Sequence, residues 1–212
     1  MAADQRDRQR PARLFFALWP EEALRRQIAA YQQPAGKAVT PANWHITLLF
    51  LGAVAPAQQQ VLEREAAAVR VPPFSLQLDR LGGWRRAGII WLAPSTAPPA
   101  LLELHQRLKA IATAAGIAIE TRPYRPHLTL ARQAPAVPLQ EIAPIPWAAS
   151  EFCLAESITA HRGARYVVRQ RWPLQEAAAA GESGCRSYGI ITHHPDAACV
   201  QRNLMDENRK KA

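Results

Sequence analysis

The amino-acid sequence predicts an α+β fold in which helices flank antiparallel sheets. Short apolar runs typical of strands are interspersed with longer segments of helical periodicity. Brief connections, such as the one around Gly82 and Gly83, are too short for the crossovers of a parallel sheet and favour antiparallel pairing. A chain of 212 residues with 49% hydrophobic content is long enough to bury a substantial core.

The first half of the body contains two helices and four strands by pattern. The first helix has Pro20 near its start and places Leu24, Ile28 and Tyr31 at helical spacing. In order, we expect a strand at 12–20, a helix at 20–33, a strand at 44–52, a helix at 55–70, and strands at 74–84 and 88–94, the last two joined through Gly82, Gly83, Arg85 and Arg86.

The second half repeats this order with changes. Its helix, 98–116, opens on a double proline and ends at Gly116. We expect strands at 126–132, 147–159 and 165–174. The apolar stripe of the helix consists of Leu101, Leu104, Leu108, Ile111 and Ala115.

Both ends of the chain differ from the body in composition. We expect a polar extension at 1–12, a folded body at 13–175 and a poorly ordered tail at 176–212. The tail holds four candidate zinc ligands, but their spacing fits no familiar closed zinc site. These ligands are Cys185, His193, His194 and Cys199. Three scattered cysteines in the whole chain argue against a disulfide framework.

The composition indicates a globular protein with a polyanionic partner. The formal net charge is +9, and the tail contributes nothing to it because its acidic and basic residues balance. The alternative is an ordinary solvated basic face.

No stretch reaches the roughly 18 apolar residues that a membrane span needs, and no apolar signal segment follows the N-terminus. We therefore expect no membrane partner and a cytoplasmic location.

Two predicted strands carry the same tripeptide, His-x-Thr, as His45 with Thr47 and His127 with Thr129. Chance predicts roughly 0.2 such matches in this composition, so two are unusual. Because side chains alternate along a strand, each His shares a face with its Thr. Two imidazoles beside two hydroxyls suit the handling of phosphate. The alternative is a pair of core histidines with ordinary hydrogen-bond partners.

The two His motifs and their flanks carry a resemblance to a known family. The segments are LFFAL at 14–18, HITLLFLG at 45–52, WLAP at 91–94, RPYRPHLTLAR at 122–132 and RYVVRQRWPL at 165–174. With these, the sequence resembles the two-histidine phosphoesterase superfamily and, within it, the bacterial RNA 2′,3′-cyclic phosphodiesterases, once called 2′-5′ RNA ligases. The resemblance covers residues 13–174, and the tail departs from it.

The resemblance implies a bilobal α+β fold with two pseudo-symmetric lobes, each an antiparallel sheet with flanking helices, and an active-site cleft between them. It implies that RNA ends with a 2′,3′-cyclic phosphate are hydrolysed to 2′-phosphate ends, by a protein we expect to be monomeric. His45 is the expected proton donor to the leaving 3′ oxygen, and His127 the base that activates water. One imidazole can be neutral and the other protonated near neutral pH, so we expect no metal and no cofactor.

Thr47 and Thr129 are candidates to donate hydrogen bonds to the phosphate. Arg132 is a third candidate, although strict alternation places it off the face of His127. Either the strand bends or bulges there, or Arg132 is structural or binds the RNA further away. Arg122 and Arg125 can bind neighbouring phosphates or be solvated loop charges. At most one of four aromatic residues is expected to stack on a base, because such residues more often belong to the core. These four are Phe15, Phe16, Trp44 and Tyr124.

Two other functions stay open at this point. The same site run in reverse gives 2′-5′ ligation of RNA, which requires two RNA ends to be held together against water. A basic RNA-binding module without turnover predicts strongly salt-dependent binding. Neither the physiological RNA nor the net direction of reaction follows from the sequence.

Overall fold

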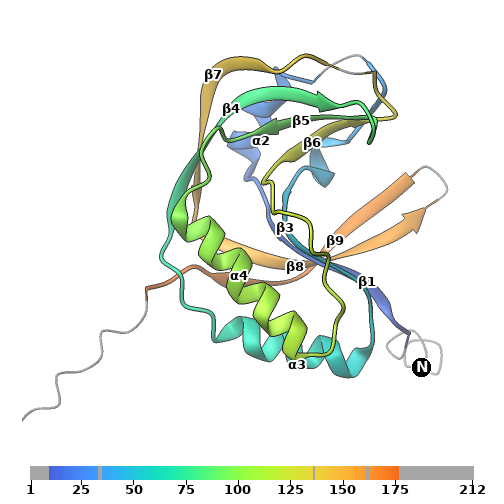
Figure 1. Ribbon diagram of the computed structural model, residues 1–212, viewed down its shortest axis with the longest axis vertical. Coiled ribbons are helices and arrows are strands. Elements are labelled where there is room, and N and C mark those ends of the chain that lie inside the picture. The colour runs from blue at the N-terminus through green and yellow to red at the C-terminus, as the bar shows by residue number, and fades with distance from the viewer. Residues whose placement is uncertain (1–9, 33–34, 136, 161–162, 177–212) are drawn as a thin grey trace, which may run out of the picture. The chain divides into compact units, whose positions relative to one another are not determined.

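The computed structural model is shown in Figure 1. It describes residues 10–32, 35–135, 137–160 and 163–176. The four candidate zinc ligands lie outside the described residues, as do nearly all of the expected N-terminal extension and tail.

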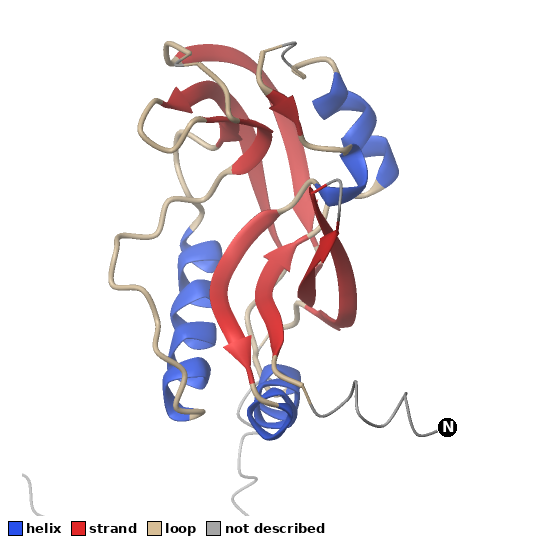
Figure 2. Ribbon diagram, turned by 90° about the vertical axis from the view of Figure 1, so that its right-hand side faces the viewer, coloured by secondary structure: helices blue, strands red, loops and turns tan. Residues whose placement is uncertain are grey.

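The described residues form three α-helices, one short 3₁₀ helix and nine strands (Figures 1 and 2). In chain order they are β1 (Ala12–Leu18), α2 (Glu22–Ala29), β2 (Lys37–Ala38), η1 (Pro41–Asn43), β3 (Ile46–Val54), α3 (Pro56–Ala67), β4 (Phe74–Trp84), β5 (Ile89–Ala93), α4 (Pro99–Ala114), β6 (Leu128–Arg132), β7 (Gln140–Ala149), β8 (Glu151–Ala160) and β9 (Gly163–Pro173).

All the strands join one sheet of order β7-β4-β5-β6-β3-β1-β8-β9, with β2 paired to β6. Every pairing is antiparallel, which confirms the predicted α+β class. The sheet narrows at its middle, where β3 and β6 are joined by a single residue pair, Ile46 with Leu128. The two strands that follow the His residues are therefore neighbours.

The strands on each side of this joint do not follow the order of the sequence. Strands β4 and β5, from the first half of the chain, lie between β7 and β6, with β4 paired to β7 and β5 paired to β6. Strands β8 and β9, from the end of the body, extend β1 and β3 instead. Helices α3 and α4 lie against the part that contains β3, and α2 lies against β7 (Figure 1). The two halves of the sequence thus exchange strands.

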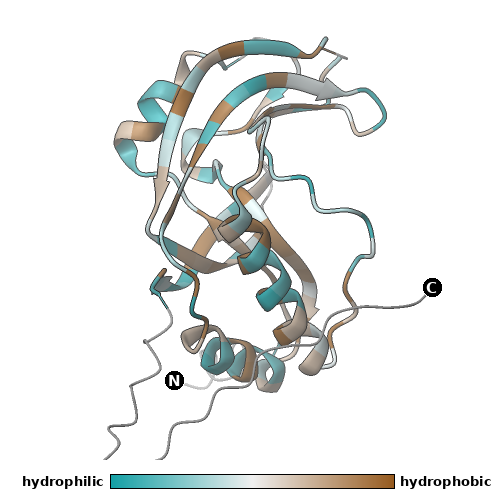
Figure 3. Cartoon of the chain, turned by 60° about the vertical axis from the view of Figure 1, so that its left-hand side comes forward, coloured by the Kyte–Doolittle hydropathy of each residue, from teal (hydrophilic) through white to brown (hydrophobic). Residues whose placement is uncertain are grey.

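The helices bury most of the stripes that the sequence predicts, except that Ile111 and Ala115 are only partly buried and Tyr31 lies beyond the end of α2. Leu24 and Ile28 of α2 are buried, as are Leu101, Leu104 and Leu108 of α4. Each such side chain stabilises the fold by about 2 kcal/mol. Polar and apolar residues alternate in the first half of β4, where Leu76 and Leu78 are buried, so one face of this strand packs inward (Figure 3). No helix in the described part of the chain is long and apolar enough to cross a bilayer.

The predicted Gly82–Gly83 turn is wrong. Both glycines lie inside β4, paired with Trp91 and Ile90, and the chain turns at 85–88 instead. A Cβ at Gly82 would lie 2.7 Å from the ring of Trp91. The glycine is needed because an indole packs against this backbone, rather than because the chain reverses there.

The strand predicted at 147–159 is two strands. The chain leaves β7 at Ala149 and enters β8 at Glu151, passing from the β4 side of the sheet to the β1 side. The earlier part of β7 escaped prediction because it contains Pro144 and Pro146. Both are tolerated because β7 is an edge strand, where a missing N–H costs no ladder hydrogen bond.

Candidate active site

Each of the two motif histidines stands immediately before its strand and is fixed in the same way. His45 Nδ1 lies 2.7 Å from the carbonyl oxygen of Asn43, and His127 Nδ1 lies 2.8 Å from that of Arg125. A carbonyl oxygen can only accept, so Nδ1 carries the proton in both rings. In each histidine Nε2 is therefore the nitrogen that can exchange a proton with a substrate.

The expected sharing of a face by histidine and threonine is confirmed for the first motif. His45 Nε2 lies 3.1 Å from Thr47 Oγ1. In the second motif, Thr129 is partly exposed between the fully buried Leu128 and Leu130, and pairs across the ladder with Trp91. Each threonine hydroxyl therefore projects from the face of its strand opposite the core.

Arg132 returns to the face of Thr129 because β6 carries a bulge. Thr129 pairs with Trp91 of β5, while Ala131 pairs with the adjacent residue Ile90, which leaves Leu130 as the extra residue. One extra residue reverses the alternation beyond it. Of the alternatives that the sequence leaves open, the structure therefore has the bulged strand.

Strand β3 carries the same bulge at the equivalent place. Thr47 pairs with Ala17 and Leu49 with Phe16, so Leu48 is the extra residue. Phe50, five residues after His45, then shares the face of Thr47, as Arg132 shares that of Thr129. The two motifs thus extend to His-x-Thr-x-x-Phe and His-x-Thr-x-x-Arg, each with its bulge after the threonine.

A third histidine, which motif reasoning did not identify, supports the first bulge. His105 of α4 donates from Nδ1 to the carbonyl oxygen of Leu48, at 2.7 Å. Its ring stacks on Tyr124 with 4.2 Å between the ring centroids. Because a bulged residue leaves the regular ladder, this bond gives its carbonyl a partner.

Three aromatic rings surround His45. Its ring stacks on Trp19 at 5.3 Å, and lies 4.9 Å from Phe15 and 5.1 Å from Tyr166. Burial lowers the pKa of His45 to about 4, against the raising effect of the Asn43 carbonyl. These surroundings therefore favour the neutral form of the imidazole.

His127 has a related environment with a single ring beside it. The edge of Trp84 meets its ring at a centroid distance of 4.6 Å. Burial lowers the pKa of His127, the Arg125 carbonyl raises it and the charge of Arg132 lowers it. Arg132 and a charged His127 also lower the pKa of His45. The two imidazoles and this guanidinium are thus near enough to act on one another.

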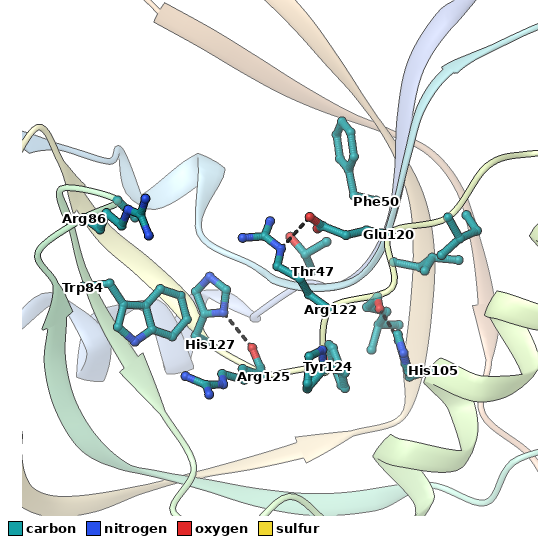
Figure 4. Close-up of a pocket in the computed structure, with 15 residues that line it drawn as sticks. Thr47, Phe50, Trp84, Arg86, His105, Glu120, Arg122, Tyr124, Arg125 and His127 are labelled. Carbon is teal, nitrogen blue, oxygen red and sulfur yellow. Dashed lines mark hydrogen bonds and ion pairs between the residues drawn. The ribbon is translucent and has the colours of Figure 1, made fainter.

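A cavity of about 540 Å³ opens beside this group. Thr47 and His127 line it, together with Phe50 and three arginines, Arg86, Arg122 and Arg125 (Figure 4). His45, Thr129 and Arg132 are not among its lining residues. His127 thus borders the cavity, whereas His45 lies outside its lining and is partly buried among aromatic rings.

Of the four aromatic candidates for base stacking, three belong to the core, in agreement with the expectation that at most one of them stacks. Phe15, Phe16 and Trp44 are 3%, 0% and 0% exposed, so none offers a ring face to a ligand. Tyr124 lines the cavity but is stacked on His105. Phe50, which lay outside that prediction, is 45% exposed and lines the cavity. No local pattern sets it apart, since only the bulge decides its face.

Comparison with known proteins identifies the family. The model of the 2′-5′ RNA ligase superfamily matches residues 20–158. The RNA 2′,3′-cyclic phosphodiesterase of Escherichia coli (strain K12) is 35% identical over 78% of this chain and 98% of its own length. The protein of the same name from Bacillus subtilis (strain 168) is 37% identical over 46% of this chain and 55% of its own.

Solved structures agree with the sequence matches. The crystal structure of Escherichia coli LigT complexed with 3′-AMP is similar with a TM-score of 0.73 and 36% identity, covering 78% of this chain and 99% of that one. A crystal structure of a Thermus thermophilus protein is similar with a TM-score of 0.66 and 26% identity, covering 78% and 100%. The chain therefore belongs to the 2′-5′ RNA ligase superfamily and is an enzyme of its RNA 2′,3′-cyclic phosphodiesterase family, as the two His-x-Thr strands predict.

Proposed function

We propose that this chain hydrolyses RNA ends that carry a 2′,3′-cyclic phosphate to 2′-phosphate ends, by acid and base catalysis between two histidines and without a metal. The observation that carries the proposal is the matched geometry of His45 and His127. Each has Nδ1 fixed by a backbone carbonyl, so that Nε2 is the nitrogen that exchanges a proton, and that of His45 lies within hydrogen-bond distance of Thr47 Oγ1. The names of the relatives support the same activity.

The reaction needs one base and one acid. His127 Nε2 takes a proton from the attacking water as the new bond from oxygen to phosphorus forms. His45 Nε2 gives a proton to the ribose 3′ oxygen as its bond to phosphorus breaks. The product is a 2′-phosphate with a free 3′ hydroxyl. After both transfers His127 has gained one proton and His45 has lost one, so the total number of protons on the two histidines is unchanged.

The surroundings of the two rings support this division of roles. His127 lines the cavity, which gives water a route to it, while aromatic rings pack around His45. Burial and the charge of Arg132 hold the pKa of His45 low. The negative charge of a bound phosphate acts in the opposite direction, so substrate binding favours the protonated His45 that the acid role requires.

The remaining site residues act on the phosphate itself. Thr47 and Thr129 donate hydrogen bonds to its non-bridging oxygens, and Arg132 stabilises the charge that builds up on them. The bulge at Leu130 brings Arg132 to the Thr129 face, where a guanidinium can bind two oxygens at once.

The test is incubation of a short RNA carrying a 2′,3′-cyclic end with the protein and an excess of chelator. We expect full conversion to the 2′-phosphate, at the same rate with chelator as without it. Strict dependence on added metal, or a 3′-phosphate product, would overturn the mechanism. Joined strands in place of hydrolysed ends would show that the reverse ligation dominates, and binding without any product would show a module without turnover.

A further inference from the structure

Two of the three arginines that line the cavity, Arg86 and Arg125, have no carboxylate partner among the residues that the structure describes. Eight arginines of the described part of the chain form ion pairs with carboxylates, Arg122 among them. Arg86, Arg125 and Arg132 form no ion pair with any residue that the structure describes. An exposed guanidinium without a carboxylate neighbour keeps its charge and its donors available for an anionic ligand.

Two of these three arginines line the cavity, and both lie close to His127. Arg86 belongs to the turn after β4, two residues beyond Trp84, whose ring edge meets His127. Arg125 precedes His127 by two residues and holds its Nδ1 through the backbone carbonyl, which leaves the guanidinium free. Figure 4 shows the two side chains on either side of the contact between Trp84 and His127.

The reacting phosphate accounts for Arg132 but not for Arg86 and Arg125. Arg132 lowers the pKa of both catalytic histidines, so its charge belongs with the group on which they act. Arg86 contributes to neither shift. The cavity, at about 540 Å³, has the size of sites that hold a whole ligand of drug-like dimensions, well beyond one phosphate.

We propose that Arg86 and Arg125 bind the phosphate on the 5′ side of the terminal nucleoside, so that the enzyme prefers a chain end to a free cyclic nucleotide. This inference rests on the proposed function. In an RNA strand, this phosphate is the anion nearest to the reacting one. A guanidinium pair is suited to a phosphodiester because its donors match the two non-bridging oxygens.

The experiment compares three substrates that share one reacting group. They are a 2′,3′-cyclic nucleotide with a 5′ hydroxyl, the same nucleotide with a 5′ phosphate, and a dinucleotide with a 2′,3′-cyclic end. We expect kcat/KM to be about tenfold higher for the second and third than for the first, as for a gained hydrogen-bonded charge contact. Equal values for all three substrates would overturn the proposal.

Arg85 supplies a matched control for Arg86. The two residues are neighbours on the same exposed turn and carry the same charge, but Arg85 does not line the cavity. We expect Arg86→Ala to reduce the preference for the 5′-phosphorylated substrates about tenfold, and Arg85→Ala to leave that preference in place. Equal losses in the two variants would attribute the effect to overall charge and would overturn the proposal.

Failure of this inference is distinguishable from failure of the proposed function. If the wild-type protein converts none of the three substrates, the hydrolytic function itself is wrong, and the inference falls with it. If it converts all three with equal kcat/KM, the proposed function stands and the proposed binding site for the second phosphate is wrong.

Discussion

The burial of His45 leads to a specific prediction about stability against acid. Trp19, Phe15 and Tyr166 enclose the ring, and burial lowers its pKa from 6.5 to about 4. In the unfolded chain the same imidazole titrates near its ordinary value. Between these two pH values the unfolded chain binds a proton that the folded protein excludes.

The sign and size of the effect follow from this difference. Since the folded pKa is the lower one, the contribution to stability is complete above pH 6.5 and is lost as the pH falls toward 4. A displacement from 6.5 to about 4 corresponds to a loss of roughly 3 kcal/mol in the free energy of unfolding. For a domain of ordinary stability this is a large fraction of the total.

The assay is urea denaturation of the wild-type protein and of His45→Gln at about pH 7.5 and about pH 4. Carboxylates that protonate in this range do so in both proteins, so their effect cancels in the difference. Between the two pH values, we expect the free energy of unfolding of the wild type to fall by roughly 3 kcal/mol more than that of the variant. An equal loss in both proteins would show that His45 titrates normally and that its aromatic enclosure does not exclude the proton.

Three further predictions concern Arg132, Phe50 and Gly36. Because the pKa values of His45 and His127 are lowered, the bell-shaped pH profile of kcat/KM should be centred below pH 6.5. Arg132→Ala should move this profile to higher pH and reduce its maximum, and a profile at the same pH as that of the wild type contradicts the prediction. Phe50→Ala should reduce kcat/KM for a cyclic nucleotide about tenfold through lost stacking, with Phe50→Tyr near normal; equal rates for all three proteins contradict it. Gly36→Ala should lower the free energy of unfolding by about 1–3 kcal/mol in urea, because a Cβ there would lie 2.7 Å from that of Ala134 at a φ of +78°; an unchanged midpoint contradicts it.

Periodicity in the sequence predicts the parts of the fold that depend on local pattern. The apolar stripes of α2 and α4 are continuous, so their helices and buried faces could be identified directly. The two His strands could be found because the same tripeptide occurs in two apolar runs. Strand pairing is a long-range property, so the exchange of β8 and β9 with β4 and β5 leaves no local trace.

The errors at the site have one main physical cause. Strict alternation assumes a regular strand, but β3 and β6 each contain an extra residue after the threonine. This extra residue brings Arg132 and Phe50 onto the site face, although alternation places both on the other side. Phe15 and Phe16 are excluded as stacking residues for a different reason, because β1 is a central strand that is buried on both faces.

The central claim is that His45 and His127 act as one acid and base unit, and a double-variant comparison tests it most directly. The measurement is kcat/KM for RNA with a 2′,3′-cyclic end in His45→Ala, His127→Ala and the double variant, with folding checked by circular dichroism. We predict that each single change costs about 10²- to 10⁴-fold and that the double change costs little more than the larger single one. Losses that multiply in the double variant, or near-normal turnover in either single variant, would contradict the account.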